Sequence, residues 1–107
     1  MPDAPTVEHT GADGSVLTLR TVLTAKTRAQ YAEVLRGNVR SQEDAWQRAV
    51  EFLFERLVVR WDIAGVPTAG ARDLLLRFRT AAPDERRVVR DTLRAHCAEW
   101  FPDVDVA

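Results

Sequence analysis

The longest amphipathic pattern of the chain lies in its middle, between Ser41 and Ile63. Its apolar residues recur at steps of three and four, the spacing that places side chains on one face of a helix. These residues are Trp46, Val50, Leu53, Leu57 and Trp61. The opposite side is polar, and Ser41 is a typical N-cap residue. The pattern predicts one continuous helix over 41–63, around which the other elements pack.

A second, narrower apolar ridge is expected on this helix. At about 100° per residue, Phe52, Val59 and Ile63 fall close together and away from the main stripe. Arg56 and Arg60 lie between the two ridges. Two interpretations stay open. The helix is covered on both sides by its neighbours, or the ridge binds another protein while the arginine stems lie along the contact.

The segment before this helix predicts a β-hairpin over residues 6–23. Two β-prone runs flank the sequence GADG, and a turn of this composition between such runs is typical of a hairpin. In the second run, Leu17, Leu19 and Leu23 alternate with other positions. Because alternate residues of a strand share one face, we expect the leucine face to pack against the helices.

Three shorter helices are predicted around the central one, over about 24–36, 69–79 and 83–100. Thr24 or Thr27 begins the first, and Thr68 caps the second. Pro83 occupies the first turn of the third. The segment IAGVPTAG, which follows the central helix, contains two glycines and a proline and predicts a loop.

Together these elements predict a mainly α fold, a small helical domain of about four helices with an N-terminal β-hairpin. A chain of 107 residues is near the common size of one domain. Within it we expect a loose tail over 1–5, the hairpin over 6–23, a helical part over 24–101 and an acidic tail over 102–107.

Composition narrows the class of protein without giving a function. Hydrophobic residues make up 46% and charged residues 29%, as in ordinary soluble domains, and the net charge of −1 indicates neither a nucleic-acid nor a membrane partner. The single cysteine, Cys97, allows no internal disulfide. Neither a signal peptide nor an apolar run of about 18 residues is present. We therefore expect a cytoplasmic protein.

Residues suited to catalysis or metal binding are few. The two histidines, His9 and His96, are far apart in sequence and fall in different predicted elements. His96 and Cys97 are adjacent, but neighbours on a helix point about 100° apart and so do not converge on a zinc ion or form a nucleophile–base pair. No Gly-rich phosphate loop is present. The sequence predicts a protein without catalysis, metal or cofactor.

A basic stretch from residue 72 to residue 94 gives the alternative function. It carries seven arginines against four acids. The arginines are Arg72, Arg77, Arg79, Arg86, Arg87, Arg90 and Arg94. A patch of this kind can contact phosphate, although acids are interleaved with the arginines. The alternative is a small helical adaptor or regulator that binds nucleic acid through this region.

One short motif resembles a known family. The run LVVRWDIAGVP contains Trp61 and Asp62 at its centre and Gly65 and Pro67 near its end. Together with the β-prone N-terminus, the Pro-started last helix and the WFP segment, it is similar to the tail assembly chaperones of long-tailed bacteriophages and prophages, especially those of actinobacterial hosts. The similarity covers about residues 15–101.

The resemblance implies a small, mostly helical, non-enzymatic protein. Members of this family keep the tape measure protein soluble before the tail tube polymerises, often with a second, frameshifted form. The implied partner is therefore a long helical client, with self-association as a further possibility. The surface that we expect to bind it is the ridge of Phe52, Arg56, Val59, Arg60 and Ile63.

Overall fold

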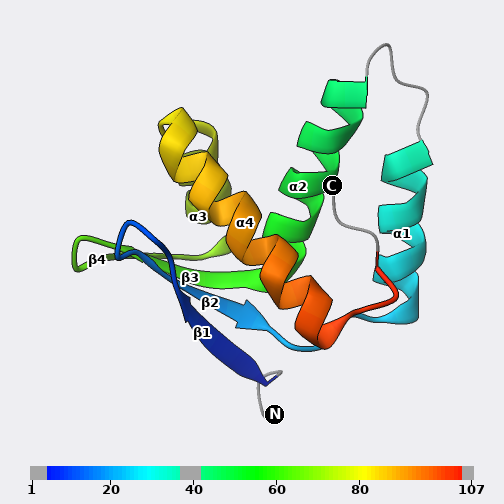
Figure 1. The fold of residues 1–107 in the computed structure, drawn as a ribbon, viewed down its shortest axis with the longest axis horizontal. Coiled ribbons are helices and arrows are strands. Elements are labelled where there is room, and N and C mark those ends of the chain that lie inside the picture. Colours follow the sequence, from blue (N-terminus) through cyan, green and yellow to red (C-terminus); the bar gives the residue numbers. More distant parts are fainter. Residues whose placement is uncertain (1–4, 37–41, 105–107) are drawn as a thin grey trace.

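The computed structural model describes the backbone of residues 5–36 and 42–104, and the side chains of the same ranges except residues 42–46. Four strands and four helices follow one another in these ranges (Figure 1). In chain order they are β1 (Thr6–Thr10), β2 (Val16–Arg20), α1 (Ala25–Arg36), α2 (Gln42–Leu57), β3 (Val58–Ile63), β4 (Val66–Ala69), α3 (Ala71–Arg79) and α4 (Pro83–Trp100).

The four strands form one antiparallel sheet in the order β1-β2-β3-β4. β1 and β2 pair around the GADG turn as the predicted hairpin does, with His9 opposite Leu17. β3 pairs with β2, with Trp61 opposite Leu17. β4 pairs with β3 and forms the other edge of the sheet, with Thr68 opposite Trp61. The fold is therefore mixed α/β, and the predicted mainly α class with a simple hairpin is wrong.

The error lies at the end of the central helix, which stops at Leu57 rather than at Ile63. The spacing of Leu57 and Trp61 fits a helix, but Val59, Trp61 and Ile63 also alternate with two charged residues, which is the period of a strand. Two valines directly after Leu57 favour extended backbone as well, because β-branched side chains are restricted in a helix. β-branching and alternation together outweigh the helical spacing.

The segment predicted as a loop after this point is the turn of a second hairpin followed by β4. Ala64 and Gly65 both have positive φ, 52° and 81°. A two-residue hairpin turn with positive φ at both positions is of type I′, whose twist matches that of the flanking strands. Pro67 lies in β4, an edge strand, where a residue without an N–H is tolerated.

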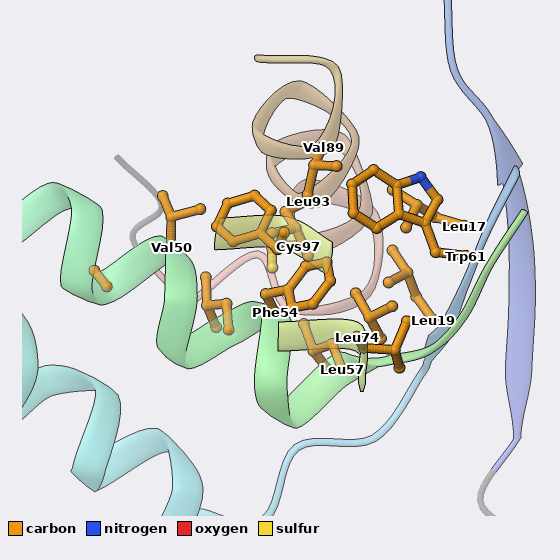
Figure 2. Packing of buried hydrophobic residues seen from close by; sticks show 14 of the residues in the cluster. Leu17, Leu19, Val50, Phe54, Leu57, Trp61, Leu74, Val89, Leu93 and Cys97 are labelled. Atoms are coloured by element: carbon orange, nitrogen blue, oxygen red, sulfur yellow. The ribbon is translucent and has the colours of Figure 1, made fainter. Parts of the chain in front are cut away.

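The helices cover one face of the sheet, and α1 lies beside α2 away from the sheet (Figure 1). Leu17 and Leu19 point to this covered face, as predicted for the leucine side of the hairpin, and both are buried. Phe54 stacks on Phe78 of α3 at 4.7 Å between ring centroids. Phe54 also meets Trp61 edge-on at 5.9 Å (Figure 2). The core thus lies between the sheet and α2, α3 and α4.

Local signals place the starts of α1 and α4. The Thr24 hydroxyl accepts a hydrogen bond from the backbone N–H of Thr27 at 3.1 Å, so Thr24 begins α1. Pro83 is in the first turn of α4, as expected. α3 begins after Gly70, with φ of 91°, and the predicted cap Thr68 is instead a residue of β4. The predicted cap Ser41 and the side chain of Trp46 lie outside the described residues.

Across the described ranges, no helix is both long enough and apolar enough to cross a membrane.

Candidate functional site: an arginine-rimmed pocket

An open pocket of about 260 Å³ lies where α2, α3 and the first turns of α4 meet. Its apolar base contains Val50 and Phe78, which are buried, and Pro83. Gln47 and Glu51 contribute from α2. The remaining wall is formed by three arginines of α4: Arg86, Arg87 and Arg90. We call these eight residues the α2–α4 pocket.

The charges around the α2–α4 pocket are unequally neutralised. Glu51 accepts from the guanidinium of Arg79 at 2.8 Å, so the acidic wall already has a cationic partner. Arg87 approaches Asp84 at 3.6 Å, a loose and exposed pair. Within the described ranges no ion pair involves Arg86 or Arg90. The pocket therefore presents net positive charge on a chain whose total charge is −1.

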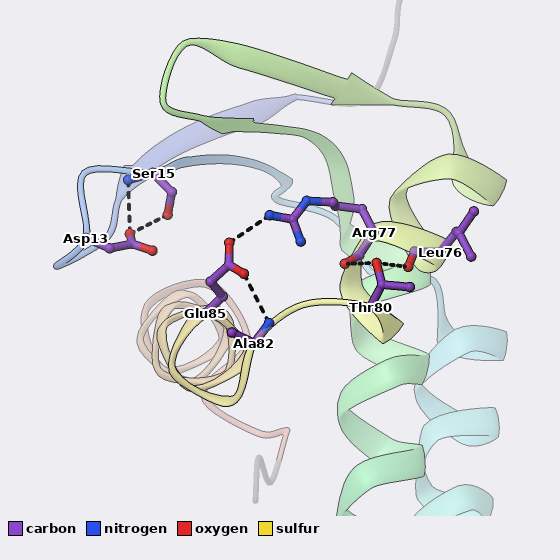
Figure 3. Close-up of polar contacts among 7 residues, drawn as sticks. All are labelled: Asp13, Ser15, Leu76, Arg77, Thr80, Ala82 and Glu85. Carbon is purple, nitrogen blue, oxygen red and sulfur yellow. Dashed lines mark hydrogen bonds and ion pairs between the residues drawn. The ribbon is translucent and has the colours of Figure 1, made fainter.

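Two other arginines of the 72–94 stretch have structural partners. Arg77 donates to Glu85 at 2.7 Å (Figure 3). Its guanidinium also lies over the ring of Trp61, 5.3 Å from the ring centroid. The second carboxylate oxygen of Glu85 accepts from the backbone N–H of Ala82 at 3.0 Å, which satisfies a free donor at the start of α4. The N–H of Ala82 and the guanidinium of Arg77 together lower the pKa of Glu85. These contacts tie α3 to the start of α4.

The two histidines, which the sequence places far apart, meet between β1 and α4. Nε2 of His9 lies 2.9 Å from Nδ1 of His96, and Nε2 of His96 lies 2.7 Å from the carbonyl oxygen of Arg20. Since a carbonyl oxygen only accepts, Nε2 of His96 carries the hydrogen and its Nδ1 accepts from His9. Burial lowers the pKa of His96, which favours the neutral ring.

Cys97 follows His96 but does not join it in a site. Its side chain is fully buried, and burial raises the pKa of the thiol to about 11. A thiol in this environment is protonated and a poor nucleophile. In the part of the chain that the structure describes, no three His, Cys, Asp or Glu side chains are grouped to hold a metal ion.

The predicted partner-binding residues do not form one helical ridge, because three of the five belong to a strand. Phe52 is on α2 and stacks against Tyr31 of α1 with ring centroids 6.1 Å apart, while Arg56 lies over its ring at 5.0 Å. Val59, Arg60 and Ile63 are on β3. The structure thus divides the five residues between the α1–α2 contact and the sheet. Partner binding by these residues stays a prediction.

Arg60 and Ile63 of the predicted site lie on opposite faces of β3, because alternate residues of a strand share one face. A register shift next to Val59 places Val58 opposite Leu19. Arg60 is exposed and pairs with Asp62 at 3.2 Å on the face that no described helix covers. Ile63 is partly buried and packs against the core.

The residues of the family-like motif are structural in this fold. Trp61 is only 1% exposed and lies in the core, although its indole N–H has no hydrogen-bond partner among the described residues. Gly65 makes the hairpin turn, and Asp62 pairs with Pro67 across the β3–β4 ladder. The motif therefore specifies the second hairpin, and none of its residues lines the α2–α4 pocket.

No family model, no curated protein and no solved structure matches this chain.

Proposed function

We propose that the protein is a non-enzymatic binding protein, a tail assembly chaperone of a long-tailed phage or prophage, that acts in the host cytoplasm. Its client is the tape measure protein, a long and largely helical chain that needs its apolar stripes covered before the tail tube forms. The observation that supports binding most directly is the α2–α4 pocket, since it combines an apolar base with two arginines, Arg86 and Arg90, for which no ion pair is found among the described residues. Grooves of this chemistry suit an amphipathic helix.

Co-expression tests the proposal. The chain is produced together with a candidate client, the product of a neighbouring gene that encodes a very long helical protein, if one is found. The soluble fraction of that client is measured with and without the chain. A chaperone raises the soluble fraction of the client, and the two proteins co-purify. A client that is equally soluble alone, or that never co-purifies with the chain, rules the function out.

The alternative, nucleic-acid binding through the 72–94 region, retains one specific observation in its favour. Arg86 and Arg90 are four residues apart on one side of α4 and have no carboxylate partner in the described ranges. Against it, Arg77 and Arg79 are engaged by Glu85 and Glu51. Binding to phosphate would show as retention of labelled DNA that weakens steeply with salt. Absence of retention at low salt removes this alternative.

A further inference from the structure

We propose that the α2–α4 pocket recognises an acidic amphipathic helix of the client, with one bulky apolar side chain in the pocket and carboxylates on Arg86 and Arg90. This inference rests on the proposed function, and it specifies the chemistry of the segment that is bound. It follows from the volume of the pocket, the spacing of its arginines and the neutralisation of its one acid.

The volume suits one large apolar side chain. The pocket measures about 260 Å³ and is open to solvent. An apolar cavity of about 150 Å³ accommodates benzene, while sites for drug-sized ligands start at about 300 Å³. Val50, Phe78 and Pro83 supply the apolar contact. A leucine or phenylalanine side chain fits this space better than a cofactor does.

The arginines match the repeat of a helix. Arg86 and Arg90 are separated by four residues of α4, or about 6 Å along the axis at 1.5 Å per residue. Two acidic residues at i and i+4 on a client helix have the same separation, so both carboxylates reach a guanidinium when the helices lie side by side. Arginine pairs with carboxylates in a bidentate manner. Arg87 lies beside them and adds to the same positive potential.

The opposite wall does not oppose an acidic ligand. Glu51, the one carboxylate among the described lining residues, is held by Arg79 at 2.8 Å, and Gln47 is neutral. An acidic helix therefore meets three arginines without an unpaired like charge among the described lining residues. A phosphate backbone would use the arginines but leave the apolar base uncovered, and no exposed aromatic ring among the lining residues is present to stack on a base. The chemistry favours the peptide.

Three labelled helical peptides test the inference by fluorescence anisotropy. One carries a leucine anchor with glutamates four residues apart, the second replaces those glutamates by lysine, and the third replaces the anchor by serine. We expect the acidic peptide to bind about tenfold or more tightly than either of the others, because each lacks one of the two required contacts. Equal binding of the acidic and lysine peptides overturns the inference.

Variants of the chain locate the site. Arg86→Glu/Arg90→Glu should weaken the acidic peptide about tenfold and shift the preference to the lysine peptide. The matched control is Arg72→Glu/Arg94→Glu, which changes the charge equally at exposed positions that do not line the pocket. The affinity of this control variant for the acidic peptide should stay within about twofold of that of the parent chain. Equal loss in both double variants would show general electrostatic attraction and reject the pocket.

A third variant tests the apolar base without altering the arginines. Gln47 is exposed at the edge of the pocket, so Gln47→Trp fills its mouth while leaving the core intact. It should weaken binding of the acidic peptide about tenfold as well. The matched control is Ala98→Trp, which adds the same ring at an exposed position of α4 outside the pocket and should leave binding unchanged. Circular dichroism of each variant verifies folding. Unchanged binding in Gln47→Trp, or displacement of the peptide by single-stranded DNA at equal charge concentration, contradicts the peptide model.

The two proposals fail in different ways. If the chain and its Arg86→Glu/Arg90→Glu variant keep the client equally soluble, the chaperone function stands and the pocket inference falls. If the acidic peptide binds in the pocket but the chain never keeps the client soluble, the binding chemistry stands and the chaperone function falls.

Discussion

The two sides of α4 treat their polar groups in opposite ways. Toward the sheet, His96 is fully buried and both of its ring nitrogens have partners, in His9 and Arg20. Toward solvent, Arg86 and Arg90 carry full charges and have no ion pair in the described ranges. A buried polar group must make its hydrogen bonds within the folded protein, because burying it without them costs free energy. An exposed charge is solvated by water, so leaving it without an ion pair costs little stability. The side of α4 that faces the sheet, which we call the inner side, therefore contributes to the stability of the fold. The side that faces solvent, the outer side, is available to bind a ligand.

The largest difference between the two sides of α4 should appear in the free energy of unfolding when a side chain on each side is truncated to alanine. Leu93 is 1% exposed and belongs to the core, so Leu93→Ala should lower the free energy of unfolding by about 2–5 kcal/mol through lost burial and a residual cavity. This is a large part of the roughly 5–15 kcal/mol that holds a domain folded. Its neighbour Arg94 is exposed, and Arg94→Ala should stay within about 0.5 kcal/mol. Urea denaturation measures both, and equal losses would remove the distinction between the sides.

The second largest effect on stability is expected at the histidine pair, which also makes the free energy of unfolding depend on pH. His96→Leu leaves the carbonyl of Arg20 without its donor and should cost about 1–3 kcal/mol at neutral pH. In the parent chain, burial lowers the pKa of folded His96 below its ordinary value of 6.5, an effect that its bond to Arg20 and the charge of Glu99 oppose and that His9 strengthens. Below pH 6.5 the unfolded chain then binds more protons than the folded chain. The contribution of His96 to stability is therefore fully present above pH 6.5 and is lost as pH falls from there through the lower pKa of the folded state.

Unfolding curves between pH 5 and 7.5 measure this loss. His96→Leu should remove the contribution of this ring to the slope. His9→Gln is the control, since its amide can still donate to Nδ1 of His96 and leaves His96 free to titrate. If the slope persists in His96→Leu, other groups cause the pH dependence.

The features of the fold that the sequence predicts correctly are mostly those set by residues close together along the chain. The leucine face of the first hairpin and the Pro83 start of α4 depend on neighbours a few residues away, and both are present. The change from α2 to β3 is also local, but the four-residue step from Leu57 to Trp61 competes with the alternation from Val59 onward. Trp61 is buried under either assignment, so burial alone does not decide between them.

The remaining features depend on contacts between distant elements. His9 and His96 are 87 residues apart, and nothing near either residue indicates that the other will face it. The α2–α4 pocket takes residues from three helices, and its arginines are distinguished from Arg77 and Arg79 only by where the partner carboxylates lie. The sequence shows an arginine-rich region. Which of its arginines form an ion pair among the described residues depends on the tertiary fold.

The third effect on stability concerns Glu85, which ties α3 to the start of α4. Glu85→Ala removes both the bond to the N–H of Ala82 and the pair with Arg77, and should cost about 1 kcal/mol, the size of losing a helix cap. The pKa of Glu85 is lowered in the folded state, so this contribution is present above its ordinary value of 4.5 and is lost as pH falls below it. Asp84→Ala, whose pair with Arg87 is looser, is the control in the same thermal unfolding series.

The smallest effect on stability is expected where the effect on binding is large. Arg86, Arg90 and Arg94 follow one another at four-residue steps on α4, and like charges at this spacing disfavour a helix by about 0.2–0.5 kcal/mol per pair. Arg90→Ala removes two of these repulsive pairs, so the free energy of unfolding in urea should rise by about 0.4–1 kcal/mol. A loss above about 1 kcal/mol would mean that the folded state itself holds Arg90. A small gain in stability together with weaker binding of the acidic peptide would show that the outer side of α4 keeps a charge pattern that its own helix does not favour.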